Sequence, residues 1–167
     1  LGRLAPLSPI DVEIDKAAGL VVAEIYIATV SCPSASVSMK DGYAVVSQDL
    51  ENTSKDNPVK LKVTDSVFAG SQTEKSVVSG TAVKIMTGAK IPQGADAVIS
   101  NEFTEEKDAG VLCYRDASVG RNILEQGHDV KRGDRIACLG EILTPTKTGL
   151  LAAGGISSVR VRRVPQI

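Results

Sequence analysis

Between residues 59 and 114 the chain alternates short apolar runs with turn residues, and this spacing constrains the fold more than any other feature. The runs are too closely spaced for helices of ordinary length and are typical of short strands joined by turns. We therefore predict a compact β-barrel or sandwich in the middle of the chain. The predicted strands cover residues 42–47, 59–68, 81–86, 95–103 and 110–114.

The two ends of the chain have a different pattern. Ser8-Pro9 has the form of a helix start, because Ser caps the first turn and Pro suits its first position, and we expect this helix to end at Gly19. Thr144-Pro145 predicts a second helix in the same way, ending at Gly154. We expect loops at 29–38 and 48–57, and further strands at 20–28, 134–138 and 157–163.

These elements indicate an α+β fold that is mainly β. We predict a discontinuous, helix-containing linker or dimerisation domain formed by residues 1–30 and 120–167, and an inserted β-rich, barrel-like domain at 31–119. The last stretch, 164–167, contains Pro165 and has the character of a linker, so we expect the chain to be a piece of a longer protein.

Charge and composition argue against several classes of function. The 19 basic and 20 acidic residues nearly cancel, and aromatic residues make up 3%, so nothing favours binding to nucleic acid. No apolar run is long enough to cross a membrane. The three cysteines are far apart and His128 is the only histidine, which argues against a disulfide framework or a zinc site. We therefore expect a reducing compartment, the cytoplasm.

Two motifs stand apart from this background. The first, Lys40-Asp41-Gly42, has the sequence of a turn, but a carboxylate between a serine-rich loop and a short strand is also suited to binding a metal ion or orienting an oxyanion. The second, Thr87-Gly88, closes a strand where free backbone N–H groups and a hydroxyl would suit an anion. By shape alone, this motif is more typical of a hairpin connection.

Together the motifs resemble those of the MoeA/gephyrin family, the molybdopterin molybdenumtransferases. The similarity runs in order over nearly the whole chain, and its segments are 17–24, 40–44, 68–70, 85–98, 122–129 and 144–152. Within them, Lys40-Asp41-Gly42-Tyr43-Ala44 resembles the family's K/M-D-G-Y-A signature. Met86-Thr87-Gly88-Ala89 matches the start of its M-T-G-A-x-x-P-x-G-A-D-A-V run.

The resemblance implies a reaction and a larger assembly. Such enzymes insert molybdenum, taken from molybdate, into adenylylated molybdopterin (adenylyl-molybdopterin), with release of AMP and the assistance of Mg²⁺. The family's active site lies between this half of one subunit and the pterin-binding domain of its partner. We accordingly expect a homodimer, and a C-terminal pterin-binding domain beyond Ile167. This chain alone would then hold half a site and be inactive.

The resemblance also assigns roles to individual residues. Asp41 would be the central catalytic carboxylate and the ligand of the cation. The other residues would contact the substrates: Lys40, Gly42, Thr87, Gly88, Glu102 and Asp129.

Two positions depart from the family pattern. Leu124 follows Asn122-Ile123 where the family usually has Arg, and His128 stands where Glu is usual. The altered stretch at Leu124 favours an alternative, a non-catalytic dimerisation or scaffold module of the gephyrin type, whereas the intact Asp41 and Thr87 favour the enzyme. A third hypothesis, a free-standing β-domain that binds a small anion, is disfavoured by the ordered series of matches.

Overall fold

The computed structural model describes residues 8–71 and 73–163, and its contacts divide the chain into two compact units. One unit combines the described residues up to Ser34 with those from Gln126 onward, and the other spans Ala35–Glu125. Within the described ranges, no helix is long and apolar enough to cross a membrane. The linker expected at 164–167 lies outside these ranges.

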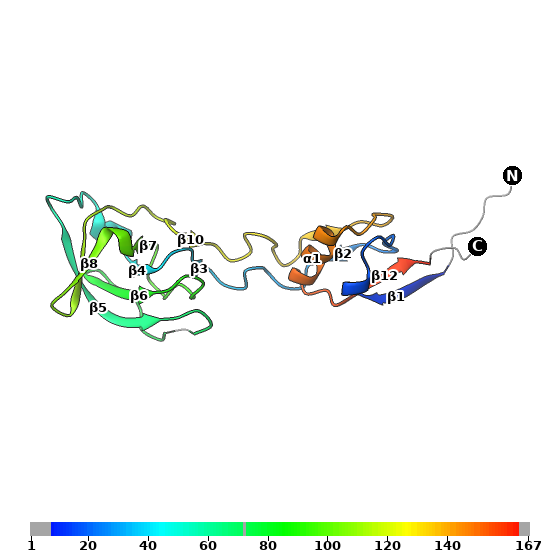
Figure 1. Cartoon of the computed structure of the whole chain (residues 1–167), viewed down its shortest axis with the longest axis horizontal. Coiled ribbons are helices and arrows are strands. Elements are labelled where there is room, and N and C mark those ends of the chain that lie inside the picture. Colours follow the sequence, from blue (N-terminus) through cyan, green and yellow to red (C-terminus); the bar gives the residue numbers. More distant parts are fainter. Residues whose placement is uncertain (1–7, 72, 164–167) are drawn as a thin grey trace. The chain divides into compact units, whose positions relative to one another are not determined.

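The unit 35–125 is built on one six-stranded sheet, in the order β7-β4-β6-β5-β9-β8 (Figure 1). All neighbours are antiparallel except β5 and β6, which are parallel. A short pair, β3 (Val37–Ser38) with β10 (Ile123–Leu124), accompanies it. The strands of the sheet are β4 (Gly42–Val45), β5 (Val59–Val67), β6 (Thr81–Ile85), β7 (Ala97–Ser100), β8 (Thr104–Lys107) and β9 (Gly110–Cys113).

The sheet is covered on both sides, because successive side chains of β4 enter two different clusters of buried residues. Tyr43 and Val45 pack with Leu61 and Ile99, whereas Ala44 packs with Ile85 on the other side. All four residues of β4 are buried, as expected for a strand that has a neighbour on each side and is covered on both faces. The expected mainly β, barrel-like fold is confirmed. Two 3₁₀ turns, η2 (Ser47–Leu50) and η3 (Asn101–Phe103), interrupt the connections.

In the other unit, the described residues form one α-helix and two short strand pairs. The helix α1 (Pro145–Ala153) begins after its N-cap Thr144, whose hydroxyl accepts a hydrogen bond from the amide of Lys147 at 3.1 Å. This confirms the second predicted helix. The strand pairs are β1 (Pro9–Glu13) with β12 (Ser158–Arg162), and β2 (Tyr26–Ile27) with β11 (Arg135–Ala137).

The first predicted helix is wrong. Residues 9–13 form strand β1, antiparallel to β12, and only Ile14–Lys16 make a 3₁₀ turn, η1. Ile10 and Val12 alternate with polar residues, so this stretch also fits a strand with one face half-buried. Pairing with β12 decides in favour of the strand over the helix. In this pairing Asp11 lies opposite Arg160, and its carboxylate is 3.7 Å from the guanidinium.

Two further predictions need correction. The strand expected over 20–28 reduces to β2 and two isolated bridges at Val21 and Val22. The sequence also gives no prediction of strand β8, because its residues, Thr-Glu-Glu-Lys, are all polar. In the structure most of them are exposed. Strand β8 pairs with β9 through a tight turn in which Asp108 and Ala109 both have positive φ, the conformation that suits two-residue hairpins.

Candidate functional site

The two motif residues Asp41 and Thr87 meet at one end of the sheet. Strands β4 and β6 are antiparallel neighbours in which Gly42 lies opposite Ile85, so the residue before β4 and the residues after β6 share an edge. The amide and the hydroxyl of Thr87 both donate to Asp41 Oδ1, each at 2.7 Å. The main-chain oxygen of Asp41 accepts from the amide of Asn101 at 3.0 Å, which also ties it to the end of β7.

These contacts favour the ionised form of the carboxylate. The Thr87 amide, and next its hydroxyl, hold the pKa of Asp41 below its usual range, because hydrogen bonds donated to the charged form stabilise it. Asp41 is exposed, and no described residue donates to Oδ2. The side chain therefore presents one oriented, ionised oxygen to an incoming ligand.

Gly42 permits the close approach of β4 to β7. A β-carbon added at Gly42 would lie 1.9 Å from the carbonyl oxygen of Ile99, far inside any tolerated contact. The glycine of the Asp-Gly pair is therefore required by packing between two strands. A direct contact of Gly42 with substrate stays a prediction.

The amides of residues 87–89, in the loop after β6, are not free. The amides of Thr87, Gly88 and Ala89 donate to Asp41 Oδ1, Ser38 O and Met86 O respectively. Free N–H groups at this turn were expected, and that expectation is wrong because the protein itself uses them. Gly88 adopts a φ of +80°, which favours glycine. Binding of an anion by Thr87 and Gly88 stays a prediction.

Lys40 and Glu102 line a common hollow of about 200 Å³. The loop before Lys40 is held by Ser38, whose hydroxyl donates to the Lys40 carbonyl at 2.6 Å and accepts from its amide at 3.2 Å. Glu102 belongs to η3, next to Asn101, whose amide holds the main chain of Asp41. The neighbourhood of Asp41 thus contains both predicted residues.

Asp129 belongs to the other unit. It is exposed, and its amide donates to the carbonyl of Cys32 at 3.0 Å. Its predicted role beside a substrate stays a prediction.

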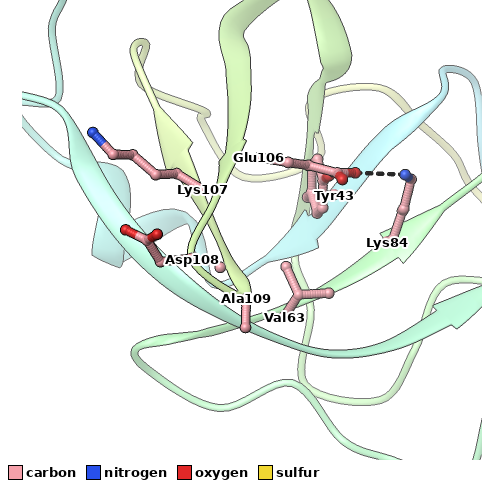
Figure 2. A pocket seen from close by; sticks show the side chains of 8 residues that line it. Tyr43, Val63, Lys84, Glu106, Lys107, Asp108 and Ala109 are labelled. Carbon is pink, nitrogen blue, oxygen red and sulfur yellow. Dashed lines mark hydrogen bonds and ion pairs between the residues drawn. The ribbon is translucent and has the colours of Figure 1, made fainter.

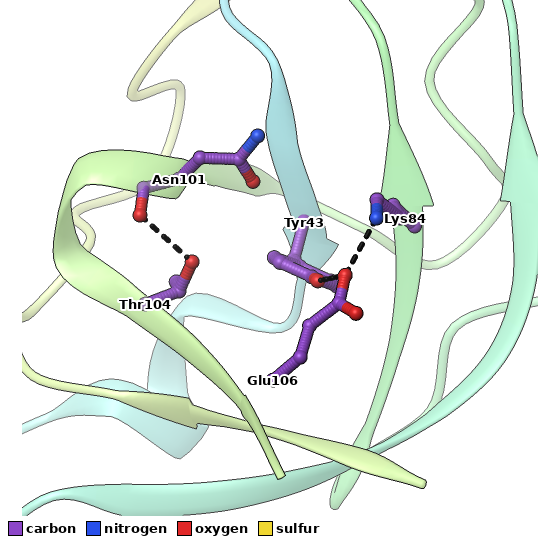
Figure 3. Close-up of polar contacts among 5 residues, drawn as sticks. All are labelled: Tyr43, Lys84, Asn101, Thr104 and Glu106. Carbon is purple, nitrogen blue, oxygen red and sulfur yellow. Dashed lines mark hydrogen bonds and ion pairs between the residues drawn. The ribbon is translucent and has the colours of Figure 1, made fainter.

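A second polar cluster, Tyr43–Glu106–Lys84, was not foreseen (Figures 2 and 3). Tyr43 is 1% exposed, and its hydroxyl donates to Glu106 Oε1 at 2.6 Å, while Lys84 Nζ contacts the same oxygen at 2.5 Å. Burial and the bond to Glu106 raise the pKa of Tyr43, and Lys84 and Tyr43 lower the pKa of Glu106. A tyrosine on a strand gives no sequence signal for its partner on a distant strand.

The cluster connects strands that are far apart in the order of the sheet. Tyr43 on β4 lies opposite Lys84 on β6, whereas Glu106 comes from β8, at the far end. The contact therefore holds the sheet curled, and it borders a hollow of about 550 Å³ that Figure 2 shows. Asp41 precedes β4 and Thr87 follows β6, so the contacts of Tyr43 and Lys84 with Glu106 connect the same two strands that position the site.

The cation expected at Asp41 can be tested against the donor set. Among residues 8–71 and 73–163, no group of three metal-ligating side chains of the His, Cys, Asp or Glu type comes together. Mg²⁺ usually keeps several waters and binds through one or two carboxylates plus substrate oxygens. One ionised carboxylate with a free oxygen fits a single position of such a hydrated ion, with the remaining ligands coming from elsewhere.

Comparison with known proteins places the chain in a family. The family model described as MoeA N-terminal region (domain I and II) matches residues 2–155. The chain belongs to this family. It is 35% identical over 158 residues to a molybdopterin molybdenumtransferase of Staphylococcus epidermidis, covering 95% of this chain and 38% of that protein. It is likewise 35% identical over 167 residues to the Staphylococcus aureus protein of the same name, covering 100% and 40%.

Solved structures agree with the sequence comparisons. Two crystal structures of the molybdopterin biosynthesis MoeA protein from Pyrococcus horikoshii superpose with TM-scores of 0.85 and 0.88, at 36% and 34% identity. They match 96% and 94% of this chain and 41% of each of those chains. The chain therefore spans about two fifths of the length of these relatives, and corresponds to the N-terminal part of MoeA proteins.

Proposed function

We propose that this chain is the N-terminal portion of a molybdopterin molybdenumtransferase, which transfers molybdenum from molybdate to adenylylated molybdopterin and releases AMP. The observation that carries the proposal is the Asp41–Thr87 pair, which joins the family's two signature motifs in one hydrogen-bonded unit. Both the family membership and the names of the relatives are consistent with it.

In this proposal Asp41 acts as an oriented anion at the edge of the sheet. An aspartate is ionised at neutral pH, and the lowered pKa of Asp41 extends this charged form to more acidic solution, so it can hold one face of a hydrated Mg²⁺ or orient a water molecule. Bound Mg²⁺ would offset the repulsion between the oxyanion and phosphate groups of the two substrates.

Thr87 has a supporting role in the same proposal. Both of its donors point at one oxygen of Asp41, so it fixes the rotamer of the carboxylate and leaves Oδ2 for the ligand. Such preorganisation matters because a reacting group must be held close to its productive geometry. Direct contact with an oxyanion would then use other groups nearby, of which Lys40 is the first candidate.

The assembly completes the proposal. We infer that a pterin-binding domain follows in the full-length chain, that a homodimer brings it to the partner's Asp41 edge, and that the protein works in the cytoplasm. The shares of 38% to 41% of the relatives' lengths leave room for such a domain.

The test is a molybdenum-insertion assay with full-length protein, adenylylated molybdopterin, molybdate and Mg²⁺. We expect formation of molybdenum cofactor with release of AMP. A protein that binds molybdopterin and dimerises, yet forms neither product, would contradict the proposal and support the scaffold alternative. Leu124 would then be the first position to restore to Arg, the residue usual in the family.

A further inference from the structure

The 200 Å³ hollow lined by Lys40, the residue before Asp41, is bordered by two further cationic side chains, Arg115 and Arg121. The three cations come from two loops, since Lys40 lies before β4 whereas Arg115 and Arg121 both lie in the connection between β9 and β10. No local sequence pattern indicates that they meet. The family resemblance assigns no role to Arg115 or Arg121.

The two arginines are held in place by their surroundings. The guanidinium carbon of Arg115 lies 4.7 Å from the ring centroid of Phe103, within the range of a cation–π contact. Arg121 Nη1 donates to the carbonyl of Asp116 at 2.8 Å. The Asp116 carboxylate stands 4.0 Å from Arg115 and 3.8 Å from Arg121, and neither contact is a close bidentate pair. A guanidinium carries five donors, and most of these remain available.

Lys40 is the third cation, and its ammonium has neither an ion pair nor a hydrogen bond among the described residues. Its main chain, however, is fixed on both sides, by the Ser38 hydroxyl and by the Asn101–Asp41 hydrogen bond. A fixed backbone with a free ammonium is suited to closing over an anion.

The size of the hollow limits what it holds. Pockets for drug-sized ligands usually measure roughly 300–1,000 Å³, and this one is about 200 Å³. A small anion therefore fits better than a whole nucleotide. Asp116 neutralises part of the charge of the arginines, and Glu102 is the one remaining carboxylate at the rim, so the hollow keeps a net positive charge.

We propose that Lys40, Arg115 and Arg121 form a binding site for a small, doubly charged tetrahedral oxyanion in the hollow that they line, one residue along the chain from Asp41. The shared chemistry fits inorganic molybdate, phosphate, or the phosphate group of a phosphoester. The identity of the bound oxyanion as a substrate rests on the proposed function, whereas the presence of an oxyanion site does not. Binding itself is measurable without turnover, so the two ideas fail separately.

The test is calorimetric titration of the 167-residue chain at about 0.01 M ionic strength with sodium molybdate, inorganic phosphate and AMP, each in turn. We expect saturable binding of molybdate and of phosphate. Lys40→Met and Arg121→Gln should each weaken it about tenfold, the loss expected for one charge-assisted hydrogen bond. Lys60→Met is the matched control, since Lys60 pairs with Asp108 on a different part of the same unit, and it should change nothing.

Glu102→Gln supplies a test of sign. Removing a negative charge from the rim should tighten binding of the oxyanion, whereas a merely structural role of Glu102 would loosen it or leave it unchanged. The inference is overturned by the absence of saturable binding, by an equal loss in Lys60→Met, by looser or unchanged binding in Glu102→Gln, or by binding of AMP alone. Circular dichroism spectra of the variants identify any that fail to fold.

Discussion

Replacement of Gly42 by alanine tests the packing that carries the site. The added β-carbon would lie 1.9 Å from Ile99 O and 2.8 Å from Ser100 Cα, both backbone atoms. Real contacts of this kind are essentially never under 3.0 Å, so β4 and β7 must separate by more than 1 Å. That movement strains the ladder that pairs residues 42–45 with 97–100.

The cost can be set against known overpacking effects. Forcing extra volume into a packed core usually costs about 1–3 kcal/mol, and a clash with backbone belongs at or above the upper end. We expect Gly42→Ala to lose about 3 kcal/mol of unfolding free energy, which lowers the urea midpoint by about 1–3 M. Urea denaturation followed by circular dichroism gives the midpoint, and hydrogen exchange at the β4 amides assigns the loss to unit 35–125.

Gly149→Ala is the matched control with the opposite sign. Gly149 lies inside α1, and a β-carbon there meets nothing within 4 Å. Alanine in a helix interior is favoured over glycine by about 0.5–1 kcal/mol, so this variant should be more stable than the wild type. A Gly42→Ala protein with the wild-type midpoint, or two alanine variants with equal losses, would refute the reasoning.

Three other predictions address the side chains around the site. Thr87→Val should raise the pKa of Asp41 towards its ordinary value by removing one of two donors, so that the carboxylate protonates at higher pH; a carboxyl NMR titration that shows no change would be contrary evidence. Tyr43→Phe should lose about 1–2 kcal/mol on urea denaturation, because the hydrogen bond to Glu106 disappears while the ring still fills the core; a neutral result would show that the bond is not stabilising. Burial raises the pKa of the Cys113 thiol to about 12, so at pH 8 a thiol reagent mapped by mass spectrometry should modify exposed Cys138 and spare Cys113 until the protein unfolds.

The pH dependence of stability follows from the direction of the Asp41 shift. A carboxyl group whose folded pKa is lowered contributes stability above its unfolded pKa, and the contribution disappears as the pH falls through the folded value. In Thr87→Val the folded pKa of Asp41 lies closer to the unfolded value, so the unfolding free energy should change less with pH in acidic solution. In the wild type, the contribution of Asp41 persists until the pH falls to its lower folded pKa.

Sequence patterns succeeded where the deciding contacts are local. The helix at Pro145–Ala153 begins after Thr144 because the Thr144 hydroxyl accepts a hydrogen bond from the amide three residues later. Both groups lie within the segment, so its own sequence predicts the helix start. The same Ser-Pro signal failed at Ser8-Pro9, because pairing with residues 158–162 overrode it. Strand β8 was missed since its partner, rather than its own polar sequence, determines it.

The site shows the same division. Asp41 and Thr87 were singled out by their motifs and their family resemblance, but their shared hydrogen bonds cross 46 positions of sequence and could only be seen in the fold. Arg115 and Arg121 lie in one loop without a motif, and Glu106 reaches Tyr43 across 63 positions. Contacts of this range depend on how the sheet curls, which a single sequence does not state.

The most direct test of the central claim compares Asp41→Asn with Asp65→Asn in the full-length protein, using the molybdenum-insertion assay. Asp65 is a matched control, because it too accepts hydrogen bonds from a threonine hydroxyl and a backbone amide that lower its pKa, and it lies on β5 of the same sheet. We predict that Asp41→Asn folds and loses about 10²-fold or more in rate, whereas Asp65→Asn stays close to the wild type. A folded Asp41→Asn enzyme with the wild-type rate would contradict the assignment of Asp41 as the central carboxylate.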